Sequence, residues 1–282
     1  MKIVRSIAET RAAVADLRRQ GRSLCLVPTM GALHEGHISL VRAAKAACDA
    51  VAVTIFVNPT QFGPNEDLSK YPRTFEADCR LLEAEDVDLL FAPDVADMYP
   101  PGATTWVEVE EIQDRLDGQS RPGHFRGVAT IVAKLFHLFA PDKAFFGQKD
   151  AAQVAILRRM VRDLHFDLEL VVCHTVREPD GLAMSSRNRY LSPEDRRHAL
   201  VLSRALHAVE AQVQAGERDA AALIATGLRT IAEEPSVRVD YFCIVDPDTL
   251  EDRPHVGNGA LVAVAAYVGP ARLIDNLLIS PI

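Results

Sequence analysis

Short runs of apolar and β-branched residues alternate with helical patterns through the first two thirds of the chain, and this alternation limits the fold most strongly. Strands are expected at residues 23–28, 50–57, 87–92, 143–146 and 167–176, with helices at 37–48, 127–139 and 150–165. Several strand runs are apolar on both faces, as in a parallel sheet that helices cover on each side. The pattern predicts an α/β fold with a doubly wound parallel sheet, whose ligands bind beyond the carboxyl ends of the strands.

A polar stretch, REPDGLAMSSRN, interrupts this alternation at residues 177–188. It is long for a simple connection, so we place a domain boundary there and expect domains of residues 1–176 and 177–282. Ser192 and Pro193 begin a helix, with serine as its cap and proline at its first position, that should run to about Ala215. A helix near 219–233 and strand-like runs at 237–245, 260–268 and 271–279 complete a smaller α+β domain.

Composition excludes several classes of protein. With 282 residues, 48% of them apolar, the chain can bury a core in each of two domains. Its formal net charge of -8 argues against a surface that holds nucleic acid. Apolar runs stay well short of the ~20 residues that a membrane helix needs, and the amphipathic N-terminus does not resemble a signal peptide. We therefore expect a soluble, cytoplasmic protein that binds neither nucleic acid nor membrane.

The cysteines are odd in number and scattered. Cys25, Cys48, Cys79, Cys173 and Cys243 form no CxxC pair and lie mostly in apolar segments. We expect five reduced, buried thiols, since free cysteine behaves as a small hydrophobic residue.

The stretch LCLVPTMGALHEGH, residues 24–37, joins a buried strand to a helix start through a turn that contains glycine. The N-terminus of a helix attracts phosphate, because its N–H groups point outward and its dipole is positive there. His34 and His37 lie three residues apart at this point, with Gly36 between them. Two imidazoles that donate to phosphate oxygens would suit nucleotidyl transfer.

Two other interpretations of these histidines are possible from the sequence. A zinc metalloprotease needs histidines four residues apart with glutamate beside the first, and HEGH does not have this spacing. Both histidines could also be ordinary exposed loop residues. A second group of donors favours the phosphate site: Met184, Ser185, Ser186 and Arg187 combine two hydroxyls with a guanidinium, although alone they would be typical of a solvated loop.

Together the two groups resemble the signature of the HIGH-type nucleotidyltransferase superfamily, whose nucleotide-binding domain is Rossmann-like. More specifically, seven segments resemble successive signatures of the pantothenate synthetase family, in order and over almost the whole chain. They are VPTMGALHEGH, VNPTQF, YPRT, RPGHFRGV, FFGQKD, MSSRNRYLS and ARLIDN. The resemblance implies an AMP-forming ligase that activates pantoate with ATP and joins it to β-alanine, uses Mg²⁺ and forms a homodimer. It does not indicate which protein groups contact the metal.

The resemblance also implies the site. ATP would bind to three segments and one single residue: Met30, Gly31, Ala32, Leu33, His34, Glu35, Gly36 and His37; Gly147, Gln148, Lys149 and Asp150; Met184, Ser185, Ser186 and Arg187; and Val176. Pantoate would bind to Gln61 and Gln153, and β-alanine close to Gln61. The catalytic residues would be His37 as proton donor, His34, Lys149 and Arg187.

One departure from the family pattern concerns Gln148. Relatives usually have glutamate there, so an indispensable carboxylate is not expected at this position. The role of the basic loop RPGHFRG, residues 121–127, is less defined. His124 and Arg126 either gate the site, contact a substrate carboxylate or belong to a structural loop. Two other functions stay open at this point, a nucleotidyltransferase that moves AMP onto a phosphorylated acceptor and a nucleotide-binding module without activity.

Overall fold

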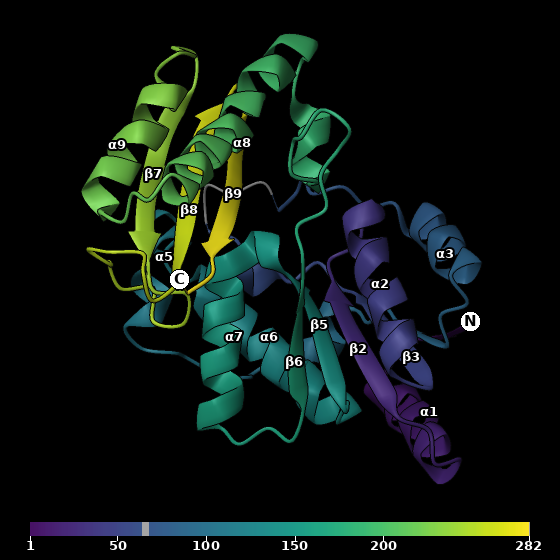
Figure 1. Cartoon of the computed structure of the whole chain (residues 1–282). Coiled ribbons are helices and arrows are strands. Elements are labelled where there is room, and N and C mark those ends of the chain that lie inside the picture. The colour runs from purple at the N-terminus through teal and green to yellow at the C-terminus, as the bar shows by residue number, and fades with distance from the viewer. Residues whose placement is uncertain (64–67, 282) are drawn as a thin grey trace. The chain divides into compact units, whose positions relative to one another are not determined.

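Six parallel strands form the sheet of the first unit in the computed structural model, which describes residues 1–63 and 68–281 (Figure 1). This unit comprises Met1–Gly147 and Ile156–His174. Its strands are β1 (Lys2–Val4), β2 (Leu24–Thr29), β3 (Ala50–Ile55), β4 (Leu89–Phe91), β5 (Lys143–Gly147) and β6 (Glu169–Cys173). Their order is β1-β4-β3-β2-β5-β6, so the chain leaves β2 toward one edge and later returns to its other side at β5. The switch point of the sheet therefore lies beyond the carboxyl ends of β2 and β5.

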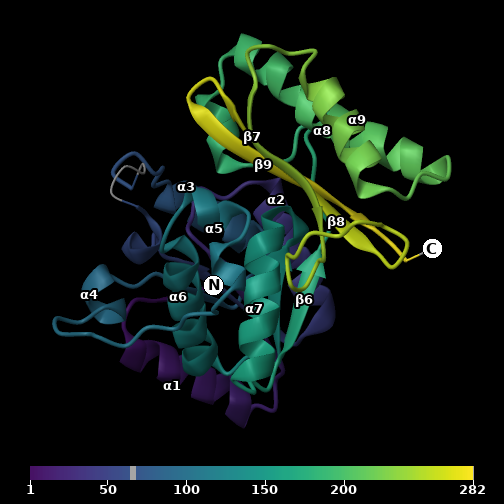
Figure 2. The same ribbon diagram turned by 90° about the vertical axis from the view of Figure 1, so that its left-hand side faces the viewer.

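Helices cover both faces of this sheet. On one face lie α2 (Glu35–Ala47) and α3 (Phe75–Ala84), whose apolar side chains join those of β2, β3 and β4 in a buried cluster. On the other lie α1 (Ile7–Arg19) and α6 (His124–Phe139), with α7 (Ala151–Asp163) beside α6 (Figure 2). Short helical turns connect these elements: η1 (Pro59–Gln61), α4 (Val95–Met98), η2 (Ile112–Asp114) and α5 (Asp117–Ser120). The predicted doubly wound α/β fold is confirmed.

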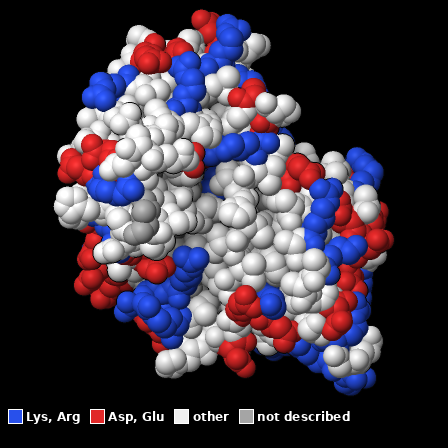
Figure 3. All heavy atoms as spheres, viewed as in Figure 1, with Lys and Arg blue, Asp and Glu red and all other residues white. Residues whose placement is uncertain are grey.

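The exposed side of α2 and α3 carries charges of both signs (Figure 3). Arg42 on α2 pairs with Glu35 on the same helix and with Glu85 at the end of α3, and these hydrogen bonds raise the pKa of its guanidinium. Pairs of this kind are solvated and add little to stability.

The second unit comprises Gln148–Ala155 and Thr175–Ile282. Its first part holds η3 (Gln148–Asp150) and the start of α7; the short helix η4 (Ser186–Tyr190) follows β6 in the chain. An antiparallel sheet of β7 (Arg238–Val245), β8 (Ala260–Val268) and β9 (Ala271–Ile279) packs against α8 (Pro193–Gln214) and α9 (Ala220–Ile231). Ser192 caps α8 as expected, because its hydroxyl accepts the N–H of Asp195 at 3.0 Å. The smaller α+β domain is thus confirmed.

Some expectations about the elements were wrong. The strand expected at 50–57 ends at Ile55 because Asn58 and Pro59 begin the turn η1, and the strand expected at 167–176 ends at Cys173. The strand β1 and the helices α1 and α3 were not expected. None of the helices among the described residues combines the length and the apolar character that a bilayer crossing requires.

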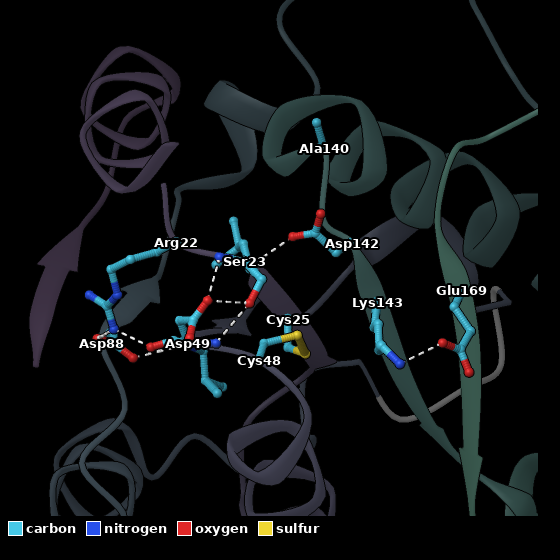
Figure 4. The surroundings of a disulfide bond; sticks show 12 residues. Arg22, Ser23, Cys25, Cys48, Asp49, Asp88, Ala140, Asp142, Lys143 and Glu169 are labelled. Atoms are coloured by element: carbon cyan, nitrogen blue, oxygen red, sulfur yellow. Dashed lines mark hydrogen bonds and ion pairs between the residues drawn. A yellow bond between two sulfur atoms is a disulfide. The ribbon is translucent and has the colours of Figure 1, made fainter. Parts of the chain in front are cut away.

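The expectation of five reduced thiols was also wrong. Cys25 on β2 and Cys48 at the end of α2 form a disulfide, with their Cα atoms 5.7 Å apart (Figure 4). The sequence shows only that both cysteines lie in apolar segments; the packing of α2 on β2 brings them together. Cys79, Cys173 and Cys243 are thiols and only partly buried, and desolvation raises the pKa of the Cys79 and Cys173 thiols.

Aspartates hold the amino ends of the strands near this disulfide (Figure 4). The carboxylate of Asp49 accepts the N–H and hydroxyl of Ser23, and these bonds lower its pKa. Burial alone would raise the pKa of Asp142, but hydrogen bonds from the Leu24 N–H and from Arg18 outweigh it and lower this pKa as well. This edge of the sheet is thereby fixed, opposite to the edge where a ligand is expected.

Candidate active site

Two histidines lie in the first turn of α2, after the loop of residues 30–33 that follows β2. His34 is the N-cap residue, and its Nδ1 accepts the N–H of Gly36 at 3.2 Å. His37 reaches back, so that its Nδ1 accepts the N–H of His34 at 3.4 Å. The arrangement is a capping box in which imidazoles replace the usual hydroxyl and carboxylate. The two rings lie 4.1 Å apart between centroids.

These contacts define the chemistry of the pair. A neutral imidazole that accepts a hydrogen bond at Nδ1 carries its proton on Nε2. His34 and His37 are therefore both arranged as Nε2–H donors, half-buried at the switch point of the sheet. Two adjacent donors of this kind suit the oxygens of a phosphate group.

The loop before the pair is held from below by Asp78, a buried residue of α3 with 1% of its surface exposed. Its carboxylate accepts the N–H groups of Ala32 and Leu33, each at 2.9 Å, and the hydroxyl of Thr74 at 3.0 Å. The N–H of Gly31 is bound by the Thr29 hydroxyl at 3.1 Å. Because these main-chain donors already have protein acceptors, a phosphate at this loop would meet chiefly the imidazoles and not the amides expected from the sequence.

Glycine is required at position 31 of this loop. Its φ is +80°, and a Cβ there would lie 3.0 Å from Ile55 and 3.1 Å from Asp78. Ala32 also has a positive φ of 52°, an uncommon conformation for a residue with a side chain. The Asp78 carboxylate compensates for this conformation by binding the N–H groups that the turn exposes.

Gln61 lies beside this loop, at the end of η1 and with 7% of its surface exposed. Its Nε2 donates to the Met30 sulfur at 3.0 Å, and its Oε1 accepts from Asn58 Nδ2 at 3.0 Å. A thioether is a weak acceptor, so a ligand oxygen would readily replace it. The structure thus brings together Gln61 and Met30, from two of the segments that the sequence assigned to the site.

The RPGHFRGV segment supports Gln61 from the other side. His124 Nδ1 lies 2.8 Å from the main-chain oxygen of Gln61, and Asn58 Nδ2 donates to the oxygen of Gly127 at 3.1 Å. A Cβ at Gly127 would lie 2.5 Å from the Thr60 oxygen, so only glycine permits this close packing. The contacts support the structural interpretation of His124. Arg126 stacks on Trp106 at 4.3 Å, another contact within the protein.

A pocket of about 250 Å³ opens at the same edge of the sheet. Met30, Gly31 and Ala32 line it on one side, and Arg5, Arg73 and Asp94 bring charges of both signs to it. The pocket therefore lies beside the loop that precedes His34.

The predicted residues of the second unit include the turn η3. Lys149 has 18% of its side chain exposed, and its Nζ lies 3.8 Å from Asp150. The side chain of Asn276 on β9 holds the main chain of this turn through hydrogen bonds to the oxygens of Gln148 and Lys149. Gln153, one turn further along α7, is half-buried.

The loop before η4 carries the remaining predicted residues. The N–H of Met184 donates to the oxygen of Val176 at 2.9 Å, so these two residues lie side by side. Ser185 caps η4, and its hydroxyl accepts the N–H of Arg187 at 3.2 Å. A serine, a second serine and an arginine are therefore presented by one short turn.

Each group of predicted residues has a defined place within its own unit. Met30–His37, Gln61 and Gly147 lie at the carboxyl edge of the large sheet, whereas Gln148, Lys149, Asp150, Gln153, Val176 and Met184–Arg187 belong to the second unit. Sequence reasoning missed Asn58, Asp78 and Asn276, which hold these segments. Their only signal was the presence of polar residues next to motifs or inside apolar elements. Among the described residues, no group of three or more His, Cys, Asp or Glu side chains is arranged to hold a metal ion.

Comparison with known proteins shows the family of the chain. The family model for pantoate-beta-alanine ligase matches residues 2–278. The chain is 67% identical to the pantothenate synthetase of Acidobacterium capsulatum, over 99% of this chain and 97% of that protein, and 52% identical to that of Thermotoga petrophila, over 99% and 100%.

Solved structures give the same result. The crystal structure of the Thermus thermophilus pantothenate synthetase matches with a TM-score of 0.95 and 48% identity over the whole of both chains. The Francisella tularensis pantoate-beta-alanine ligase, described as complexed with Beta-gamma ATP and Beta-alanine, matches with a TM-score of 0.80 and 36% identity over 99% of this chain and 97% of that one. The match of the family model and the identity to full-length relatives show that this chain belongs to the pantoate-beta-alanine ligase family.

Proposed function

We propose that this ligase condenses pantoate with β-alanine to form pantothenate, with ATP as substrate and pantoyl adenylate as intermediate. The observation that carries the proposal is the pair of imidazole donors at the switch point of the sheet, in a chain that belongs to this family. The Francisella tularensis relative is described as a complex with an ATP species and β-alanine, two of the three substrates proposed here.

The first step activates a poor acyl donor. An oxygen of the pantoate carboxylate attacks the α-phosphorus of ATP, the bond to the bridging oxygen breaks, and pyrophosphate leaves with the electron pair. Negative charge grows on that bridging oxygen, where Nε2–H donors of His34 and His37 would stabilise it. His37 is the proposed proton donor. Lys149 would add a point charge and Arg187 a planar pair of donors to the phosphates.

In the second step the neutral amine of β-alanine attacks the acyl carbon of the adenylate. The bond from that carbon to the phosphate oxygen breaks, AMP leaves with the electron pair, and the attacking nitrogen loses a proton as the amide forms. Gln61 and Gln153 would hold pantoate through neutral amides, which neither repel its charge nor act as nucleophiles. Gln61 would also lie near β-alanine. Orientation and electrostatic stabilisation carry the catalysis, without a covalent enzyme intermediate.

Bound Mg²⁺ would supply the remaining charge compensation on the triphosphate. The described residues include no dedicated cluster of ligands for it, so phosphate oxygens and water are the expected ligands, as is usual for this ion.

We further propose that the two groups of donors, residues 30–37 in the domain 1–176 and residues 184–187 in the domain 177–282, converge on one nucleotide. Their residue types support this, since each group alone would leave part of the triphosphate charge unbalanced. Family resemblance also supports a homodimer in the cytoplasm. Sedimentation equilibrium of the purified chain tests the dimer, and a single species of monomer mass would refute it.

The function is tested by two assays on the purified protein. Exchange of labelled pyrophosphate into ATP should require pantoate but not β-alanine, because the first step is reversible. Free AMP should appear in quantity only when β-alanine is added, together with pantothenate detected by mass spectrometry. A nucleotidyltransferase would instead retain AMP in its product, and a silent nucleotide-binding module would give no exchange. Either result would refute the ligase mechanism.

A further inference from the structure

Two neighbouring polar residues, Asp275 and Asn276, lie buried in the otherwise largely apolar strand β9. They have 4% and 6% of their surface exposed. They belong to the segment ARLIDN, residues 271–276, which resembles a family signature. Burying a carboxylate and an amide is costly unless both are hydrogen-bonded, so their contacts reveal what they do.

Both polar atoms of the Asn276 side chain form hydrogen bonds with the turn η3. Its Nδ2 donates to the main-chain oxygens of Gln148 at 3.0 Å and Lys149 at 2.9 Å. Its Oδ1 accepts a hydrogen bond from Gln148 Nε2 at 3.0 Å. Two of these hydrogen bonds fix the backbone from which Lys149 projects, across a sequence separation of 127 residues for Lys149 itself, and the third holds the Gln148 side chain.

These contacts also give Gln148 a role that a glutamate could not fill in the same way. Because both protons of Asn276 Nδ2 serve the main chain, its Oδ1 needs a donor, and the Gln148 amide supplies one. An ionised glutamate has only acceptors and would face this oxygen without a hydrogen bond. The Gln148 amide therefore completes the hydrogen bonds of the Asn276 side chain.

Asp275 holds the base of the other predicted phosphate-binding segment. Its carboxylate accepts two hydrogen bonds from Arg177, at 2.7 and 3.0 Å, and Arg177 also donates to the oxygen of Gly181 at 3.1 Å. Arg177 pairs with Ala183 in an isolated bridge, one residue before Met184. The Asp275–Arg177 pair thus closes the hairpin-like loop that ends in the Met184–Arg187 turn.

Successive side chains of a strand point in opposite directions, so two adjacent residues can reach two different segments. Building on the proposed function, we propose that Asp275 and Asn276 are positioning residues. They attach the turn that carries Lys149 and the loop that leads to Arg187 to one strand. The two cationic side chains thereby keep a fixed position relative to each other, as binding of the triphosphate requires. Neither residue is required to touch substrate.

The test combines Asn276 with Lys149 in a double-mutant cycle. Asn276→Ala should lower kcat for pantoate-dependent pyrophosphate exchange about 10- to 100-fold, because a displacement near 1 Å can cost about 10²-fold. The KM for pantoate should stay within about twofold. In the Lys149→Ala background, Asn276→Ala should cost less than about twofold more, since residues that act through one another are not additive.

Two further variants keep the test decisive if Asn276→Ala folds poorly. Asn276→Asp retains the volume but replaces both donors, so it should reproduce the loss of kcat. Asn258→Asp makes the same chemical change at an exposed site of this unit and should leave kcat unchanged. Melting temperatures show whether each variant is folded at the assay temperature.

The outcomes separate the two proposals. Losses that multiply in the Lys149→Ala background, or an unchanged kcat in Asn276→Asp, would overturn the positioning role. A wild-type protein without pantoate-dependent exchange would refute the proposed function instead. In that case the same double-mutant cycle can be measured with the affinity of each variant for a nonhydrolysable ATP analogue. The effects of Asn276→Ala and Lys149→Ala on this affinity should again be non-additive.

Discussion

His34 and His37 cap the start of α2 with ring nitrogens, whereas most helices are capped by the oxygens of serine, threonine or aspartate. The exchange has a chemical consequence. A hydroxyl that caps a helix has no other polar atom in its side chain. An imidazole that caps through Nδ1 has a second nitrogen, Nε2, on the far side of the ring. The same contacts that start α2 therefore fix the orientation and the tautomer of both rings.

Removing either ring should slow adenylate formation far more than it changes the fold. We expect His34→Ala and His37→Ala to lower the rate of pantoate-dependent pyrophosphate exchange about 10²- to 10³-fold, the usual effect of losing one preorganised donor. His255→Ala, at an exposed position of the second unit, is the control and should keep its rate. A folded variant with the full rate would remove that histidine from the mechanism.

Asp78 should matter for both stability and rate. In Asp78→Asn one oxygen is replaced by an NH₂ group, which would face a main-chain N–H of Ala32 or Leu33. Leaving such a buried donor unpaired costs about 1–3 kcal/mol, which urea denaturation would detect. The exchange rate should fall as well, because the loop before His34 loses its support. Glu76→Gln, exposed on the same helix, should change neither quantity.

The residues proposed to carry chemistry could be selected from the sequence, but those that hold them could not. HEGH and SSR are visible as local patterns of polar residues at element ends. Asp78 acts on a loop 45 residues away, and Asn276 on a turn 127 residues away. No local pattern encodes such a pairing, because it depends on how complete elements pack.

At the scale of elements, β2 and α2 are joined at both ends, by the loop of residues 30–34 and by the Cys25–Cys48 disulfide. Most of the long strands and helices were predicted from apolar periodicity, but the helices α1 and α3 were not. The strand β1 was not, because three residues are too few to show a period, and its partner β4 comes from a distant part of the chain. The disulfide was likewise hidden, since it depends on the length of α2 and on its placement over β2.

We expect the disulfide to stabilise the protein without affecting catalysis. Closing a loop of this length contributes about 3 kcal/mol in the chain-entropy model. Urea denaturation with and without reductant should show a loss of that order in the free energy of unfolding. Cys48→Ser should be as stable as the reduced protein, and reductant should not change its stability. Activity should be equal in all three, since Cys25 lies at the start of β2 and the histidines follow its end. Equal stability with and without reductant would contradict the prediction.

The aspartates at the amino edge of the sheet predict a loss of stability in acid. Folding lowers the pKa of Asp49 and Asp142 below the ordinary value of 3.8, so their ionised forms stabilise the folded state at neutral pH. This contribution should be complete above about pH 5 and should disappear as the pH falls below about 4. Urea midpoints measured across this range should fall, and Asp142→Asn should reduce the slope. A slope equal to that of the wild type would exclude Asp142 as a cause.

At the scale of the whole molecule, the proposed mechanism makes both units necessary for one reaction. The histidines belong to the first unit, and Lys149 and Arg187 belong to the second. In this mechanism both groups of donors contribute to balancing the charge of the triphosphate. Water must also be excluded until the amine attacks the reactive adenylate. Binding of the intermediate should therefore bring the units together.

A nonhydrolysable analogue of pantoyl adenylate should accordingly make the protein more compact. Small-angle scattering with saturating analogue should give a smaller radius of gyration than the free protein. The effect should be weaker in Arg187→Ala, which removes a donor of the second unit, and unchanged in the exposed Asn258→Asp variant. Fluorescent labels placed on the exposed side of α2 and on α9 should likewise move closer together when the analogue binds. If the scattering curves and label distances are identical with and without the analogue, the two groups of donors do not close around one ligand, and catalysis would have to rely on one unit alone.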